Sequence, residues 1–179
     1  GKSADRTSRY KSIQLHRGYL ASDTFDKNSF DAIIFTHVFE HVPNPKEILG
    51  IVDHIAKSGA ILQIEIPNIC SWQAKLFKGK WFHLDPPRHL NMFSPTKLKS
   101  ELEKLGWNLV TEKYFSPQFS PFGVQQSILN LFLSKRDALY EHLKGNKEYT
   151  KDISRISLLL QELFQWVTYP LFLFTDLIA

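Results

Sequence analysis

Short apolar runs alternate with amphipathic segments along the first two thirds of the chain. Residues 32–35 are continuously apolar, and residues 60–66, which include Gln63 and Glu65, form a second strand-like segment that is rich in isoleucine. Continuous apolar runs of this length are typical of parallel strands covered on both faces. Between them, residues 45–57 carry apolar side chains at helical spacing. The order strand, helix, strand predicts a parallel pair joined by a right-handed crossover, with both strand ends flanking one cleft.

The helix between the two strands has clear start and stop signals. Asn44 is a good N-cap, Pro45 suits the first helical position, and Glu47 sits where a capping box needs an acid. Gly59 follows as a plausible C-terminal cap. These residues predict a helix over 45–57.

Later segments predict one more helix and one more strand. Ser94-Pro95 starts a helix that stops at Gly106, and the alternation over 107–115 favours a strand. A short strand is also expected at 13–15. Ser116 to Gly123 contains two prolines and marks a boundary, so we divide the chain into an α/β domain at 1–116 and a helical appendage at 117–179.

The appendage predicts helices at 124–144 and 152–178, the second kinked or broken at Pro170. Most residues after Leu158 are apolar, a pattern that resembles a transmembrane span. Glu162 and Asp176, among other polar residues, argue against that interpretation. An amphipathic helix is favoured, and it would cover the cleft, form a dimer, or lie on a membrane surface.

Composition narrows the class of protein. The chain of 179 residues is 43% hydrophobic and 22% charged, which is ordinary for a globular domain. The formal charge of +4 comes from scattered residues, so we expect no nucleic-acid partner.

Cys70 is the only cysteine, which excludes an internal disulfide and a cysteine-based zinc site. We expect it to be buried and unreactive. A reducing cytosol fits, and the polar N-terminus is no signal peptide, so we expect a cytoplasmic protein.

A set of short motifs in unbroken order resembles the class I S-adenosylmethionine-dependent methyltransferases. The likeness is greatest to the branch with His-Val-x-Glu-His after its fourth strand, here His37 to His41. Each motif alone is weak, whereas the ordered set over residues 12–116 is fairly specific. The motifs lie at 30–31, 37–45, 58–59, 67–68, 87–90, 93–95 and 105–107.

The resemblance implies a Rossmann-like sheet that is only partly present. Residues 13–15, 32–36, 60–66 and 107–115 would be the third, fourth, fifth and sixth strands. The family's first, second and last strands are missing, and no glycine pair has the Gly-x-Gly spacing of its cofactor loop. The chain is therefore expected to be a fragment cut at both ends.

The resemblance also implies the activity. The full-length protein would transfer a methyl group from S-adenosylmethionine to an O, N or C nucleophile on a small-molecule or glycan-like acceptor. Tyr19 and Leu20 would lie beside the adenine, and His37 near the methionine part of the cofactor. Without the glycine loop, the fragment is expected to bind the cofactor poorly.

Three residues are candidates for acid–base chemistry. His41 is the candidate base because an imidazole titrates near neutral pH. Glu40 would orient that imidazole or bind substrate, and His89 would reach the cleft from a later segment. The alternative is structural: Glu40 and His41 cap the helix at 45–57 and tie the loop to its neighbours. The same alternative applies to His89.

A metal site is the weaker interpretation of these residues. His37, Glu40, His41 and His89 have spacing similar to the divalent-ion motif of small-RNA 2′-O-methyltransferases, with a histidine in place of the first carboxylate. Such ligands would suit zinc better than magnesium. Spacing alone is weak evidence, and we expect no metal.

The missing first strand leaves strand 32–36 with an open edge. We expect that edge to pair with another chain, or to be covered by the N-terminus or the C-terminal helices.

An alternative to the methyltransferase function is a non-catalytic interaction module. Its apolar C-terminal helices would serve dimerisation or peripheral membrane contact.

Overall fold

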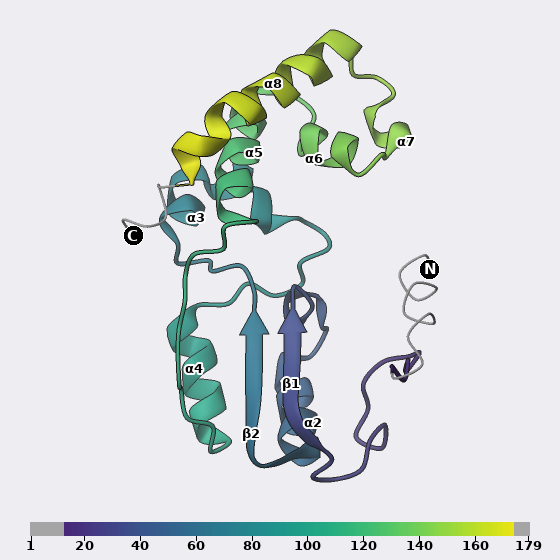
Figure 1. The fold of residues 1–179 in the computed structure, drawn as a ribbon, viewed down its shortest axis with the longest axis vertical. Helices are drawn as coiled ribbons and strands as arrows, with labels where there is room; N and C mark the ends of the chain where they lie inside the picture. Colours follow the sequence, from purple (N-terminus) through teal and green to yellow (C-terminus); the bar gives the residue numbers. More distant parts are fainter. Residues whose placement is uncertain (1–12, 174–179) are drawn as a thin grey trace.

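The computed structural model describes residues 13–173. Its α/β part is a two-stranded parallel sheet, in which β1 (Phe30–Thr36) pairs with β2 (Ala56–Glu65). Helix α2 (Pro45–Ile55) connects them, after a short 3-10 helix, η1 (Phe39–His41). Both strands run toward the helical part of the molecule in Figure 1. The predicted strand–helix–strand unit and its shared carboxyl edge are therefore present.

The start of α2 follows the sequence signals, whereas its end does not. Asn44 is the N-cap residue and Pro45 occupies the first helical turn, but the Asn44 side chain makes no capping hydrogen bond; its Nδ2 donates to Glu47 Oε2 at 3.2 Å instead, so the predicted capping box is not formed. The helix ends at Ile55, two residues early, and β2 begins at once. Gly59 lies inside β2 with a φ of +79°, at the place where the register shifts. It permits a bulge in the strand and caps no helix.

The sheet is covered on one face only. Helix α2 lies behind the strands in Figure 1 and buries Leu49, Ile51, Val52 and Ile55. Ile34 of β1 is 64% exposed, and Ile61 of β2 is 70% exposed. The expectation of strands covered on both faces is therefore wrong for the described residues, because they provide no layer over these two side chains.

Two predicted strands are absent. Helix α4 (Pro95–Lys104) starts as expected, with Ser94 Oγ accepting a hydrogen bond from Lys97 N. Residues 107–115 after it, and residues 13–15, have no strand structure. A strand needs a neighbour for its backbone N–H and C=O groups. The described residues supply no such neighbour to either segment.

The rest of the chain is helical. Helix α3 (Trp72–Phe77) and the 3-10 helices η2 (Lys78–Lys80) and η3 (Phe82–Leu84) precede α4. After residue 116 come α5 (Ser120–Phe132), α6 (Ala138–Leu143), α7 (Lys147–Thr150) and α8 (Arg155–Phe172). The helix predicted at 124–144 is thus divided in two, because the backbone is extended at Leu133 and left-handed at Asp137, which has φ +53°. Pro170 lies inside α8 and does not end it.

One apolar core joins α3 to α5 across the predicted boundary at residues 116 and 117. Its buried members are Ala74, Phe77, Trp81 and Val124. Helix α5 is also tied to α8, because Gln125 Nε2 donates to the Gln165 carbonyl at 2.7 Å and to Thr168 Oγ1 at 2.8 Å. Helix α3 and the helices after residue 116 therefore lie together beyond the carboxyl edge of the sheet, as Figure 1 shows.

Two further expectations concerned the burial of Cys70 and the possibility of a membrane-spanning helix. Cys70 is exposed, so the prediction of a buried thiol is wrong. Among residues 13–173, no helix combines the length and apolar character that crossing a bilayer requires.

Candidate functional site

His37 follows the last residue of β1, where the chain turns away from the sheet. It has a φ of +50°, which a non-glycine residue adopts only when the surroundings hold it there. Its backbone N–H donates to the Glu65 carbonyl at 2.9 Å, and its ring contacts Phe119 with ring centres 4.3 Å apart. The strand ends and the segment before α5 thus fix His37 between them.

Glu40 lies in η1, directly behind His37, and is only 1% exposed. Its Oε1 is 3.5 Å from His37 Nδ1 and 3.8 Å from His89 Nε2. Neither carboxylate oxygen accepts a well-directed hydrogen bond from the described residues. A buried carboxylate with distant partners is costly. This cost is the feature of the site that most needs an explanation.

His41 and His89 are held by backbone carbonyls. His41 Nδ1 lies 2.8 Å from the Arg88 carbonyl, and His89 Nδ1 lies 2.8 Å from the His83 carbonyl. A carbonyl only accepts, so each Nδ1 carries the proton in the neutral ring, and each Nε2 has the lone pair. The two rings lie 4.8 Å apart, centre to centre.

The segment that carries His89 reaches η1 through a defined set of contacts. Arg88 forms a fork with Asp85, at 2.7 Å from Nη2 to Oδ1, and lies 3.6 Å from Glu141 of α6. The Glu40 carbonyl accepts from Leu90 N at 3.0 Å and from Asn91 N at 3.1 Å. These bonds bring Glu40, His41 and His89 together, and we call these three residues the Glu/His cluster.

Neighbouring groups shift the pKa values of His37 and Glu40. The Glu40 carboxylate raises the pKa of the His37 imidazole above its ordinary value. Burial by itself raises the pKa of Glu40, but His37 and His89 outweigh it and hold that pKa below its usual value. At neutral pH the cluster therefore contains a carboxylate.

His83 is a site residue that the sequence interpretation missed. Burial, followed by the repulsion of a charged His37, lowers the pKa of its imidazole to about 4, so the ring is neutral at pH 7. Its carbonyl fixes His89, and a Cβ on Gly123 would overlap its Nε2. In the sequence, only the neighbouring Trp81 and Phe82 could have indicated this role, because they predict apolar surroundings for His83.

The structure brings some of the predicted site residues together and leaves others apart. The three candidates for acid–base chemistry form the cluster, and the Arg88 carbonyl, rather than Glu40, orients His41. Tyr19, expected beside the adenine, is 87% exposed, and Leu20 is half-buried. Of the structural alternative, the contact of His41 Nδ1 with the Arg88 carbonyl ties the loop to a neighbouring segment, whereas neither Glu40 nor His41 caps α2, whose N-cap is Asn44.

The described residues fit only part of an S-adenosylmethionine site. His37 is placed at the carboxyl end of β1 with one ring nitrogen, Nε2, that no described residue hydrogen bonds. The exposed Tyr19 forms no enclosed wall for an adenine ring, and the chain has no Gly-x-Gly loop. The residues present therefore do not form a complete cofactor site.

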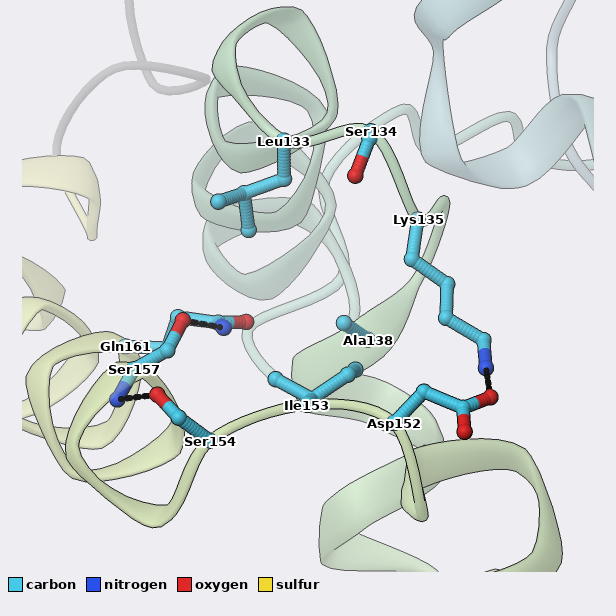
Figure 2. Close-up of a pocket in the computed structure, with 9 residues that line it drawn as sticks. All are labelled: Leu133, Ser134, Lys135, Ala138, Asp152, Ile153, Ser154, Ser157 and Gln161. Carbon is cyan, nitrogen blue, oxygen red and sulfur yellow. Dashed lines mark hydrogen bonds and ion pairs between the residues drawn. The ribbon is translucent and has the colours of Figure 1, made fainter.

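A separate cavity of about 330 Å³ lies in the helical part, between the connection from α5 to α6 and the start of α8 (Figure 2). Its polar lining includes Lys135, Asp152 and Gln161, and Lys135 Nζ lies 3.6 Å from Asp152 Oδ2. No residue of the Glu/His cluster lines it. This cavity is therefore not part of the candidate site.

Comparison with known proteins gives one finding. The family model described as a methyltransferase domain matches residues 3–112. Searches of curated proteins and of solved structures found no match.

Proposed function

The chain belongs to the methyltransferase-domain family, and on this premise we propose that it serves methyl transfer from S-adenosylmethionine. The acceptor in this proposal is an O, N or C nucleophile of a small-molecule or glycan-like compound. S-adenosylmethionine would supply an electrophilic methyl group. This chain's own residues would hold the acceptor and remove its proton.

The observation that carries the proposal is the Glu/His cluster at the carboxyl edge of the sheet. Ligands of parallel α/β sheets bind at this edge. His41 is exposed and has its Nε2 lone pair available, because Nδ1 is engaged with the Arg88 carbonyl. His41 is therefore the proposed base, with Glu40 and His89 on the buried side of the acceptor site.

The proposed contacts with S-adenosylmethionine are those that the family resemblance implies. His37 would lie near the methionine part, and Tyr19 and Leu20 near the adenine. Because the chain has no Gly-x-Gly loop, we expect residues 1–179 alone to bind the cofactor weakly. A gene that encodes a strand and a Gly-x-Gly loop upstream of Gly1 would support the proposal.

The test is methyl transfer from isotopically labelled S-adenosylmethionine to a panel of small-molecule and glycan acceptors. In a protein that is active, His41→Ala should lower kcat by about 100-fold or more, the usual contribution of a general base. His54→Ala, an exposed histidine at the end of α2, is the matched control and should leave kcat unchanged. Equal rates for the two variants would show that His41 is not the base.

The exposed face of α8 favours a second candidate, a non-catalytic interaction module. Seven apolar side chains at helical spacing are more than half exposed along this helix. They are Ile156, Leu159, Leu160, Leu163, Trp166, Val167 and Leu171. A contiguous apolar surface of this kind is typical of a protein or membrane interaction site. In this candidate function, the helix would dimerise the protein or bind a membrane surface.

Two measurements separate the candidates. Calorimetry with S-adenosylmethionine tests the enzyme, and flotation with liposomes together with sedimentation velocity tests the module. Cofactor binding without lipid binding or dimerisation favours the enzyme. Association that Trp166→Glu abolishes, in a chain that binds no cofactor, favours the module.

A further inference from the structure

The Glu/His cluster has the arrangement of a metal site, and we propose that Glu40, His41 and His89 bind one divalent transition-metal ion of the zinc type. The proposal rests on the proposed function only for the ion's role in the reaction. Binding of the ion is a separate property, which is measured without cofactor or acceptor.

The first argument is the state of Glu40. Its side chain is 1% exposed, and both carboxylate oxygens are buried without a hydrogen-bond partner among residues 13–173. Buried carboxylates are normally paired with a cation or with several N–H groups. His37 Nδ1 is the nearest donor, and at 3.5 Å it compensates the charge only partly. A bound cation would provide the missing compensation.

The second argument is the orientation of the two histidines. Each donates Nδ1–H to a backbone carbonyl at 2.8 Å, one of residue 88 and the other of residue 83. Histidines that bind metals characteristically donate their other ring N–H to a carbonyl or carboxylate, which fixes the tautomer and the ring. Both Nε2 atoms are thereby prepared as ligands before an ion arrives.

The third argument is proximity. One ligand atom from each of the three residues lies within 4.8 Å of the others. Zinc binds imidazole nitrogen and carboxylate oxygen at about 2.0–2.2 Å, so small side-chain rotations would close the triad around an ion. Glu40 is buried and His89 is half-buried, whereas His41 is exposed. The triad is therefore open on the His41 side, as in catalytic zinc sites with three protein ligands and one exchangeable position.

The donor set indicates the kind of metal. Two imidazoles and one carboxylate suit zinc and similar transition metals better than magnesium or calcium, which prefer oxygen ligands. His37 is not among the three ligands, because its ring nitrogens face Glu40 and Glu65. Sequence spacing alone was weak evidence for a metal site. The arrangement of Glu40, His41 and His89 in the structure is the reason to replace the expectation of a metal-free site.

An ion at this position would act on the acceptor side of the proposed reaction. A bound transition metal lowers the pKa of a coordinated water or hydroxyl group. With its Nε2 occupied by the ion, His41 would act as a ligand and no longer as the base, and an acceptor oxygen bound at the exchangeable position would release its proton to water more readily.

The test measures metal binding on the whole chain. The protein is treated with a chelator, and zinc is then titrated by calorimetry, with bound metal counted by elemental analysis. We expect one equivalent of zinc. His41→Gln and Glu40→Gln should each weaken binding by about 10-fold or more, since each removes one of three ligands. His54→Gln and Glu47→Gln, at exposed positions of α2, are the matched controls and should leave the affinity unchanged.

Folding is checked on the same variants by circular dichroism without metal. His41 is exposed, so His41→Gln keeps the test valid if a substitution of the buried Glu40 unfolds the protein. The visible absorption of bound Co²⁺ provides a second readout, which should disappear in His41→Gln.

No zinc binding, or equal binding by His41→Gln and His54→Gln, would overturn the metal site. That result would leave the proposed methyl transfer untouched, with His41 acting directly as base. Conversely, one equivalent of zinc in a protein that transfers no methyl group would support the site and count against the proposed function.

Discussion

At the scale of single residues, Gly123 determines how closely α5 approaches the site. An added Cβ would overlap His83 Nε2, which lies against the backbone of this helix. The backbone of α5 therefore passes directly against the residue whose carbonyl fixes His89. Through this contact the helical part of the molecule participates in positioning the Glu/His cluster.

Gly123→Ala tests this close approach. The added methyl group must displace His83 or shift α5, and overpacking of this kind costs about 1–3 kcal/mol of unfolding free energy. Gly50→Ala in α2 is the control, because its Cβ would meet no atom within 4 Å. It should stabilise the protein by about 0.5–1 kcal/mol through helix propensity. Urea unfolding measures both, and equal free energies for the two variants would contradict the prediction.

Asp137 provides a prediction about pH. Burial raises the pKa of its carboxyl above the ordinary value, although Asn130 and Arg136 donate hydrogen bonds to it. A raised folded-state pKa means that the unfolding free energy contributed by this group is highest at low pH. That contribution falls as the pH rises from 3.8, the ordinary value, through the raised value.

Asp137→Asn removes this titration. Asparagine tolerates the left-handed backbone conformation at this position, so the substitution leaves the turn before α6 intact. The difference in unfolding free energy between variant and wild type should therefore shift in the variant's favour as the pH rises. Chemical denaturation at a series of pH values from 4 upward measures it. A difference that is constant or shifts the other way would refute the assignment.

At the scale of elements, the two leucines of the short helix α6 differ in burial. Leu139 is fully buried, whereas Leu143, one turn later in the same helix, is about half exposed. Arg88 lies beside Glu141 of this helix. Packing of α6 therefore also supports the segment that carries His89.

Leu139→Ala should lower the unfolding free energy by about 2–5 kcal/mol, the usual cost of truncating a buried leucine. Leu143→Ala is the matched control and should cost less than about 1 kcal/mol. Thermal and urea unfolding measure the change. A loss for Leu139→Ala as small as that of the control would show that α6 is not packed as described.

Strands and helices differ in how well local pattern predicts them. Helices α2 and α4 begin where Asn44-Pro45 and Ser94-Pro95 predict, since caps and helical hydrogen bonds are local. The pattern at 107–115 predicts a strand that the structure does not have. Its alternation is compatible with a strand, but strand formation depends on a partner from elsewhere in the chain.

At the scale of the whole molecule, two of the apolar surfaces that residues 13–173 expose bear on association. One is the outer face of the sheet, with Ile34 and Ile61, and the other is the exposed face of α8. Among residues 13–173, β1 pairs only with β2, so its other edge has no strand beside it. The C-terminal helices pack at the carboxyl edge instead (Figure 1). The expectation that the N-terminus covers the β1 edge concerns residues 1–12, which lie outside the described residues.

We predict that the chain associates with itself through the open edge of β1. Unpaired strand edges with apolar side chains form intermolecular sheets readily. Ile34→Lys should reduce association, whereas Leu90→Lys, at an exposed residue away from the strands, should not. Sedimentation velocity at increasing protein concentration measures the effect. A monomer at every concentration would contradict the prediction.

The sequence alone determined the α/β class, the parallel pair with its crossover helix, and the strand end that carries His37, Glu40 and His41. It did so because caps and apolar runs are local signals, and because parallel strands end at one edge. Only the tertiary structure decided that His89 meets Glu40, since the segment around Arg88 and Asp85 is irregular. The tertiary structure also introduced His83. Its burial arises from α5, 40 residues away in the sequence, and such a contact leaves no periodic pattern in the chain.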